Sequence, residues 1–171
     1  MAPPLAWDDV PSPIGPLRIL ASDKGLRALH MGKAPPAPAE AVHDARAIAP
    51  FASALERYFG GDARALDALP LDVDIGTPFQ RRVWKALRTI PYGETRSYAW
   101  LAGKVGSPLA MRAVGQANGR NPVAIVVPCH RVVAADGGIG GYGGGLDRKR
   151  FLLELERRAA TKGRREAPLV A

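Results

Sequence analysis

The chain has 171 residues, of which 47% are hydrophobic and 23% charged, and its formal net charge is +8. This composition predicts a folded protein of one domain or two small ones and excludes an intrinsically disordered chain. The single cysteine, Cys129, excludes an internal disulfide and a multi-cysteine zinc site. The three histidines lie far apart in the sequence, so we expect no bound metal.

The N-terminus and the hydropathy pattern bear on localisation. The first residues lack the basic start and apolar core of a secretory signal, so we expect none. No apolar run approaches the roughly 20 residues of a membrane span. We therefore expect a soluble, cytoplasmic protein without a membrane segment.

Charge is divided unevenly along the chain. Residues 1–76 carry 7 Lys/Arg against 10 Asp/Glu, a net charge of −3, whereas residues 77–171 carry 17 against 6, a net charge of +11. This asymmetry predicts two structural units with a boundary near residue 76, and a polyanion as the partner of the second unit. A solvated basic surface without a ligand is the commoner explanation of charge alone.

The first 76 residues carry short strand-type runs and one helix. The Asp23–Gly25 turn is typical of a hairpin. Apolar side chains at helical spacing predict a helix over Arg46–Phe59 that ends at Gly60–Gly61. Leu66–Gly76 alternates apolar and acidic residues, as in a linker with some strand character. Three apolar runs between turn residues predict strands at Trp7–Val10, Leu17–Ala21 and Leu26–Met31.

A strong helix start opens the second unit. Thr77 is a capping residue, Pro78 takes the first helical position, and Gln80 completes a capping box. Pro91–Gly93 ends this helix. The apolar residues recurring at helical spacing are Phe79, Val83, Leu87 and Ile90.

Two shorter helices then form a helix-turn-helix pattern. We expect the first at Ser97–Lys104, a turn at Gly106, and the second from Ser107 to about Ala117. An outer helix face that carries a long cation and small residues allows the helix to lie close in a DNA groove. The alternative is an ordinary face exposed to solvent. At about 100° per residue the inner face holds Ala110, Ala113, Val114 and Ala117, and the outer face holds Arg112, Gly115 and Gln116.

The cysteine lies in Ala124–Val133, where a strand-type apolar run passes through Pro128 into Cys129, His130 and Arg131. Most lone cysteines are small buried apolar residues, which is the simplest interpretation. A rigid approach through Pro128 and neighbouring cations, which lower a thiol pKa, favour a nucleophile instead. Adjacent side chains of an extended chain point to opposite faces, so Cys129 and His130 can cooperate only through a turn or a bridging water.

A glycine-rich loop and a helix follow the cysteine. Asp136–Gly145 is either a floppy loop or one whose backbone approaches a flat ligand, with Tyr142 as its single large side chain. We expect Asp147 to cap the last helix, and Glu156, one turn beyond Leu152, to lie near its buried edge. The side chains expected inside are Phe151, Leu152 and Leu155.

Pro128–Val132 closely resembles the signature of the O6-alkylguanine-DNA alkyltransferases, or methylated-DNA–protein-cysteine methyltransferases. The resemblance covers residues 77–158 strongly and residues 1–76 only in general character, which leaves 159–171 as a basic tail. It implies an α+β protein with a small, RNase H-like N-terminal domain and a mostly helical C-terminal domain carrying a winged helix-turn-helix. Further segments match in order and spacing: Thr77–Gln80, Pro91–Gly93, Ser97–Tyr98, Arg112–Gly115, Asn121–Pro122 and Tyr142–Leu146.

The resemblance implies a single-turnover repair reaction without a cofactor. A damaged guanine is flipped out of the duplex, because its O6-alkyl carbon cannot be reached in the stack. The Cys129 thiolate attacks that carbon and keeps the alkyl group as a stable thioether, with O4-alkylthymine as a second candidate substrate. The implied partner is double-stranded DNA, bound through its minor groove with little sequence preference. We expect a monomer, and leave cooperative binding along DNA open.

The family's residue roles carry over position by position. His130 would take the thiol proton through a water, and Glu156 would orient that histidine. Asn121 would hold the turn around the cysteine. Tyr98 would hydrogen-bond the base, assist departure of guanine and crowd the DNA backbone, while Arg112 would replace the base in the stack. The remaining implied contacts are Val132 and Cys129 to the guanine amine, Tyr142 and Gly143 to its O6 side, and Ala113, Gly115 and Gln116 to DNA.

Some positions depart from the family pattern. Gly143 stands where serine is frequent and Ala124 where some members have proline, so we hypothesise a roomier pocket that accepts larger alkyl groups. Met111, on the helix expected from Ser107 to about Ala117, stands where a smaller residue is common in the family.

Three other classes of function compete with the alkyltransferase interpretation. Cys129 argues against an alkyltransferase-like lesion-binding protein, the chain length against a fused transcription regulator, and the Cys129–His130 adjacency against a cysteine hydrolase.

Overall fold

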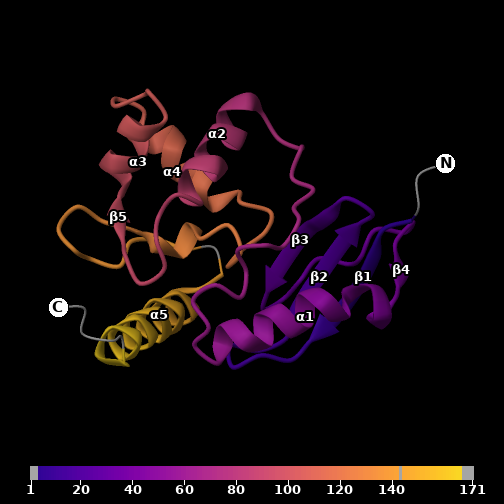
Figure 1. Ribbon diagram of the computed structural model, residues 1–171. Helices are drawn as coiled ribbons and strands as arrows, with labels where there is room; N and C mark the ends of the chain where they lie inside the picture. The colour runs from indigo at the N-terminus through magenta and orange to yellow at the C-terminus, as the bar shows by residue number, and fades with distance from the viewer. Residues whose placement is uncertain (1–3, 143, 167–171) are drawn as a thin grey trace.

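The computed structural model describes residues 4–142 and 144–166, with the side chains of 164–166 outside that description. An N-terminal sheet covered by one helix lies beside a group of helices from the second half of the chain (Figure 1). Within the described residues, no helix is both long enough and apolar enough to cross a membrane. The N-terminal elements are β1 (Ala6–Val10), β2 (Leu17–Ser22), β3 (Gly25–Met31), β4 (Val42–His43) and α1 (Ala45–Phe59).

The N-terminal sheet has the order β3-β2-β1-β4, with antiparallel β1/β2 and β2/β3 pairs and a parallel β1/β4 pair. The three predicted strands and the hairpin turn are confirmed, since Ser22 pairs with Gly25 across a two-residue loop. Strand β4 was not expected from the sequence, because it is only two residues long. The predicted strand character of 66–76 is also confirmed: Leu26 donates to the Pro70 carbonyl at 2.9 Å, and its own carbonyl accepts from Asp72 at 2.8 Å.

Helix α1 covers one face of this sheet (Figure 1). Its first turn is capped by Asp44, whose carboxylate accepts from the Ala47 amide at 3.0 Å. The helix ends at Gly60, and Gly61 adopts a φ of +98°. The buried side chains of α1 recur at helical spacing, so they form one apolar face that packs on the sheet. The buried side chains are Ile48, Phe51, Ala54, Leu55 and Tyr58.

The C-terminal elements surround the cysteine segment. The predicted capping box at Thr77 and Gln80 is present. Helix α2 ends at Leu87, before the predicted Ile90, although Ile90 remains buried in the following turn. The elements are α2 (Pro78–Leu87), β5 (Arg96–Ser97), α3 (Tyr98–Lys104), α4 (Met111–Gly119), the 3₁₀ turn η1 (Cys129–Arg131), β6 (Val132–Val133) and α5 (Leu146–Glu166). Strands β5 and β6 pair in parallel.

Two predicted details of α4 are wrong. The helix begins at Met111, because Ser107–Ala110 forms a separate turn closed by the Ala110 amide and the Ser107 carbonyl at 2.9 Å. Ala113 was expected on the inner face but is exposed; Val114 and Ala117 alone of the expected inner face are fully buried. Because α4 begins at Met111 instead of Ser107, it is shorter than expected and buries fewer side chains.

Helix α5 also differs from expectation. It begins at Leu146, so Asp147 lies in its first turn instead of capping it. Phe151 was expected to be buried, but 40% of it is exposed, whereas Leu152 is fully buried. The reason is that α5 buries the face carrying Lys149, Leu152 and Glu156, and Phe151 lies beside that face.

The apolar run before the cysteine is not a strand, contrary to the prediction. Ile125 adopts a φ of +72°, which is strained for a β-branched residue. The Val126 amide donates to the Ala124 carbonyl at 2.9 Å, and the Cys129 amide donates to the Val127 carbonyl at 2.8 Å. The segment therefore coils through tight turns, and Ile125 is buried in the core instead of pairing with a neighbouring strand.

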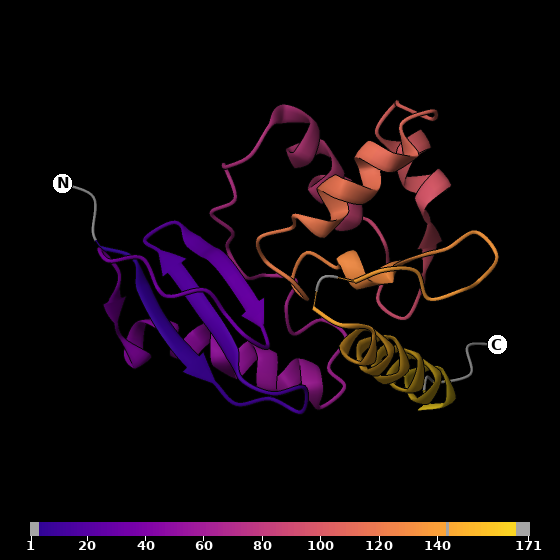
Figure 2. The same cartoon turned by 180° about the vertical axis from the view of Figure 1, so that it is seen from behind.

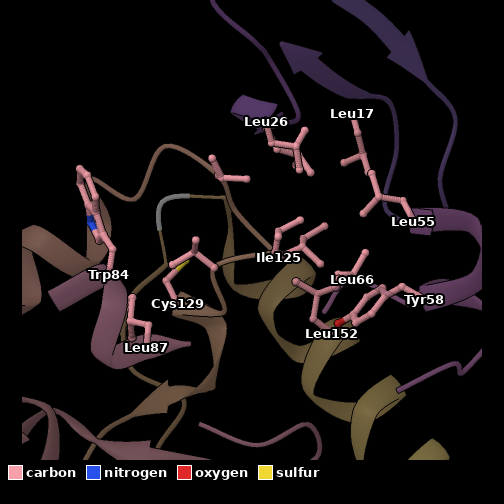
Figure 3. Packing of buried hydrophobic residues seen from close by; sticks show 14 of the residues in the cluster. Leu17, Leu26, Leu55, Tyr58, Leu66, Trp84, Leu87, Ile125, Cys129 and Leu152 are labelled. Atoms are coloured by element: carbon pink, nitrogen blue, oxygen red, sulfur yellow. The ribbon is translucent and has the colours of Figure 1, made fainter. Parts of the chain in front are cut away.

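One hydrophobic core runs through both halves of the molecule (Figure 3). Leu17 and Leu26 from the sheet, Leu55 and Tyr58 from α1, and Leu152 from α5 surround the coiled segment that carries Ile125. Seen from behind, the loop that follows α4 and the start of α5 lie between the sheet and the helices (Figure 2). Cys129 belongs to this shared core, so the two halves jointly position it.

Candidate active site

Cys129 opens the 3₁₀ turn η1 and is 6% exposed. Its carbonyl accepts from Val132 and, at 3.4 Å, from the Asn118 amide nitrogen. Asn121 closes the preceding coil, because its side chain donates to the Val127 carbonyl at 2.6 Å and accepts from the Val123 amide at 3.0 Å. Side-chain hydrogen bonds from Asn118 and Asn121, together with the tight backbone turns, thus fix the backbone around the thiol.

A buried ionic cluster lies behind the turn. His130 Nε2 is 2.7 Å from Glu156 Oε2, and both side chains are at most 1% exposed. Arg131 Nε and Nη2 donate to the two oxygens of the same carboxylate, at 2.8 and 3.1 Å. The Tyr58 hydroxyl donates to Oε2 at 2.5 Å. Helix α5 thus holds Glu156 against both the cysteine turn and α1.

The charges in this cluster follow from its partners. Burial alone would raise the pKa of Glu156, but His130 and Arg131 outweigh it and hold the pKa at about 2. Burial lowers the pKa of His130, and the attraction of Glu156 opposes that shift only in part. We therefore assign an ionised Glu156, balanced by the permanently charged Arg131, and a neutral His130 whose Nε2–H donates to it.

This assignment leaves the other imidazole nitrogen available. His130 Nδ1 is buried and has no hydrogen-bond partner within the described part of the chain. With Nε2 protonated, Nδ1 is an acceptor and can take a proton. Cys129 and His130 lie in a 3₁₀ turn instead of the extended segment that the sequence suggested. No direct hydrogen bond joins their side chains among the contacts of the described residues.

The thiol lies among groups that stabilise its anion. Burial raises the pKa of Cys129, whereas the side chains of Asn121 and Tyr142 and the charge of Lys149 lower it. The Tyr142 hydroxyl is buried and has no hydrogen-bond partner among the described residues, although it is close enough to the thiol to lower the pKa of Cys129. Burial of this hydroxyl, together with the nearby thiol, raises the tyrosine pKa, so it remains a potential donor.

Lys149 is a site residue that sequence analysis missed. Its side chain is fully buried, and Nζ donates to the carbonyls of Val132 at 2.6 Å and Gly141 at 3.2 Å. Burial lowers the pKa of Lys149 to about 8, although the attraction of Cys129 acts in the opposite direction. The signal was its spacing, because it shares a helical face with Leu152 and Glu156, but it stands in a run of basic residues typical of a solvated surface.

A cavity of about 580 Å³ opens at the thiol. Cys129, Tyr98, Tyr142 and Asn118 line it from the C-terminal half, and the end of β3 lines it from the N-terminal half. Such a volume is that of a small-molecule binding site. No part of the cavity wall was expected from the first 76 residues, because His30 in β3 belongs to no recognisable motif and has the appearance of an ordinary strand residue.

The residues predicted to meet DNA lie on α3 and α4. Arg112, Ala113 and Gln116 are exposed on α4, and Gly115 lines the mouth of the cavity. A Cβ atom on Gly115 would lie 4.0 Å from the Tyr98 ring, so the tyrosine stands directly against this helix. The Val132 carbonyl, predicted to contact the base, already accepts from Lys149. Gly143 lies outside the described residues.

Comparison with known proteins gives a consistent result. The 6-O-methylguanine DNA methyltransferase profiles match the chain twice, the DNA-binding domain at residues 78–158 and the ribonuclease-like domain at residues 7–73. The chain belongs to this methyltransferase family. The methylated-DNA–protein-cysteine methyltransferase of Mycolicibacterium paratuberculosis is 51% identical over 90% of this chain and 93% of its own, and that of Methanosarcina barkeri is 47% identical over 88% and 96%.

Solved structures of the methyltransferase family support the same architecture. A crystal structure titled Mycobacterium tuberculosis OGT in complex with DNA superposes with a TM-score of 0.80 at 47% identity, covering 90% of this chain and 94% of that one. The O6-methylguanine methyltransferase of the same organism gives 0.80 at 44% identity, covering 97% and 96%. The expected arrangement of an N-terminal domain with strands and a helical C-terminal domain is therefore confirmed.

Proposed function

We propose that this protein repairs DNA directly, by transferring the alkyl group of O6-alkylguanine irreversibly to Cys129. The observation that carries the proposal is the placement of the sole thiol, in the wall of a cavity of about 580 Å³, beside a neutral imidazole anchored on an ionised carboxylate. Each molecule then reacts once, because a thioether is stable. O4-alkylthymine is a second candidate substrate, and no cofactor enters the reaction.

The reaction proceeds as a displacement at carbon. A water carries the thiol proton of Cys129 to His130 Nδ1, and Glu156 stabilises the imidazolium that forms. The sulfur attacks the alkyl carbon, a C–S bond forms, and the C–O6 bond breaks with its electron pair leaving on guanine. Tyr98 supplies a proton to the departing base. Lys149 and Tyr142 stabilise the thiolate before attack.

We further propose how the base reaches the thiol. The guanine flips out of duplex DNA into the cavity, because the alkyl carbon is inaccessible in the stack. Arg112 fills the vacated position, and α4 lies in the minor groove, where the small side chains of Ala113 and Gly115 permit close approach. Gln116 contacts the DNA beside them. Asn121 fixes the cysteine turn, and Val132, Tyr142 and Gly143 contact the base edge.

The finer architecture belongs to the same proposal. Helices α3 and α4 form the helix-turn-helix, and the β5–β6 pair with the loop that follows it forms the wing. The N-terminal sheet and α1 constitute an RNase H-like domain within residues 1–76, and residues 77–158 form the transfer domain. Residues 159–171 are a basic tail, of which 159–166 continue α5. We propose a monomer in solution, and the question of cooperativity on DNA is open to direct measurement.

A stoichiometric transfer assay tests the function. The protein is incubated with duplex DNA carrying O6-methylguanine labelled in its methyl group, and the label is located by peptide mass spectrometry. We expect one equivalent of label on Cys129 and none in Cys129→Ser. Turnover beyond one equivalent would contradict the proposal, as would tight binding of the lesion without transfer.

A further inference from the structure

The N-terminal domain contributes part of the cavity wall. Leu29, His30 and Met31 at the end of β3, with Lys33 beyond it, face the same cavity as Cys129. The end of β3 is fixed beside the cysteine segment, since the Leu29 amide donates to the Pro122 carbonyl at 2.9 Å. This wall is therefore a constant feature of the site and has a defined position relative to the thiol.

Met31 packs directly on the glycine-rich loop. A Cβ atom placed on Gly144 would lie 3.0 Å from the Met31 Cε atom, 3.4 Å from its Sδ atom, and 2.9 Å from the Tyr142 ring. Such a Cβ would approach Cε and the ring more closely than ordinary van der Waals contact allows, so the thioether and the tyrosine ring leave no room for a side chain on Gly144. The space between β3 and the loop is closed by the Met31 side chain, which is flexible and unbranched.

Arg148 fixes the distance between this wall and the loop. Its Nε donates to the Ile14 carbonyl in the N-terminal domain at 3.0 Å, and its Nη1 donates to the Gly144 carbonyl in the loop at 3.0 Å. The guanidinium also lies 3.1–3.2 Å from the position of a Cβ on Gly32, directly after Met31. One rigid, planar group thus ties both sides of the gap that Met31 fills.

We propose that Met31 is a specificity-determining residue that limits the size of the O6-alkyl group, and that Arg148 is the positioning residue that sets this limit. The proposal rests on the proposed function, since it assigns a substrate preference to the same cavity. A large alkyl group that projects from the O6 atom of the base must displace the Met31 thioether. The thioether has no free space towards Gly144. A methyl group reaches the Cys129 sulfur without displacing the Met31 side chain.

The ratio of single-turnover rate constants for O6-benzylguanine and O6-methylguanine in the same duplex tests the role of Met31. In Met31→Ala this ratio is expected to rise about tenfold, the scale on which a few methylene groups alter selectivity in an apolar pocket. Met31→Leu conserves the volume and is expected to keep the wild-type ratio. Val42→Ala, which shortens an exposed side chain of the same sheet, is the matched control.

A second variant narrows the same gap. Gly144 does not have a positive φ, so alanine is compatible with its backbone. Its methyl group would press on Met31 and Tyr142, and Gly144→Ala is expected to lower the benzyl-to-methyl ratio. Adding Met31→Ala should restore the ratio, because the two residues share one contact, and non-additivity is the signature of such coupling.

Arg148 is tested by the same ratio. Arg148→Gln removes one of the two tethers and is expected to raise the ratio, as Met31→Ala does, whereas Arg148→Lys retains a charge and one donor and should recover part of the selectivity. Arg150→Gln, two residues further along α5 with an exposed ion pair to Asp147, is the control. A merely structural role for Arg148 would reduce both rate constants equally and leave the ratio unchanged.

The outcomes separate this inference from the function on which it rests. Because both substrates meet the same protein sample, any loss of folded protein cancels in the ratio. Transfer to Cys129 with a ratio that stays at the wild-type value in Met31→Ala, or additive effects of Met31→Ala and Gly144→Ala, would overturn the role of Met31. An absence of transfer from either substrate in the wild-type protein would instead overturn the proposed function.

Discussion

At the scale of single residues, the site places a neutral imidazole and a buried thiol next to each other in the core. Burial raises the pKa of Cys129 and lowers the pKa of His130, so neither group is ionised by its surroundings alone. The proposed proton transfer between them creates a thiolate and an imidazolium together. Lys149 stabilises the thiolate, and Glu156 stabilises the imidazolium.

Lys149→Met is expected to slow alkylation by about tenfold for each pKa unit by which the thiol pKa rises. The reason is that Lys149 is the positive charge that lowers the pKa of Cys129 against its burial. The thiolate fraction increases with pH, so the pH–rate profile should move to higher pH. Free O6-benzylguanine as substrate avoids effects on DNA binding. Lys85→Met, on the exposed side of α2, serves as the control, and an unshifted profile in Lys149→Met would refute this role.

Tyr58 and Tyr92 offer a matched comparison of buried hydroxyls. The Tyr58 hydroxyl donates to Glu156, whereas the Tyr92 hydroxyl has no partner within the described residues, and the two rings contact each other at 6.0 Å. Tyr58→Phe is expected to lower the free energy of unfolding by about 2 kcal/mol, since it leaves a buried carboxylate one donor short. Tyr92→Phe should be neutral or stabilising. Denaturant titration measures both, and equal losses would contradict the argument.

At the scale of elements, the sequence predicted the parts whose signal is local. The capping box at Thr77, the three long strands and α1 were recognisable because cap chemistry and apolar periodicity act within a few residues. The two-residue strands β4, β5 and β6 were not, since so short a segment is specified by its neighbours. Phe151 was misplaced because an apolar residue at the edge of a helical stripe can be either buried or exposed.

The candidate site was predictable only where the family signature marked it. Cys129, His130 and Glu156 were named from sequence, but the coil before them was mistaken for a strand, because its apolar run hides the positive φ of Ile125. Lys149 was missed because a buried lysine is rare and stood in a basic run. Tyr58 and Met31 were missed because their contribution depends on how the two domains pack, which no local pattern encodes.

Two glycines with similar backbones allow the packing of α5 to be measured. Gly93 and Gly106 have φ values of +82° and +78°, but a Cβ on Gly93 would lie 2.6 Å from the Ala160 Cβ, whereas nothing lies within 4 Å of one on Gly106. Gly106→Ala is expected to cost about 1 kcal/mol of stability from backbone strain alone. Gly93→Ala should cost about 3 kcal/mol, because it also displaces α5. Thermal or denaturant unfolding gives both values, and similar costs would show that α5 tolerates displacement.

At the scale of the whole molecule, the two domains meet at the reaction centre. The shared core extends from Leu17 and Leu26 in the sheet to Leu152 in α5 (Figure 3), and Tyr58 of α1 reaches the carboxylate that anchors His130. The N-terminal domain therefore contacts the Glu156–His130 pair through Tyr58 and contributes the end of β3 to the cavity wall. Because core and ionic cluster are common to both domains, we expect unfolding in a single cooperative transition.

The same cluster makes global stability depend on pH in a predictable direction. The pKa of His130 lies below its ordinary 6.5 through burial, so the unfolded chain binds a proton more readily once the pH falls below 6.5. Against its burial, His130 and Arg131 hold the pKa of Glu156 at about 2 instead of 4.5, so its contribution is complete above pH 4.5 and is lost as the pH falls towards 2. Both shifts have the same sign, and stability should fall continuously on acidification.

Denaturant titrations from neutral pH down to about 3 measure this dependence. Glu156→Gln is expected to be less stable at neutral pH, because it leaves Arg131 without its buried partner, but its stability should vary less with pH below 4.5. Glu154→Gln, which changes an exposed carboxylate two residues away, is the control and should retain the wild-type pH dependence above about pH 4.5. If the stability of Glu156→Gln fell as steeply with acidification as that of the wild-type protein, the group that takes up the proton would lie outside the buried cluster.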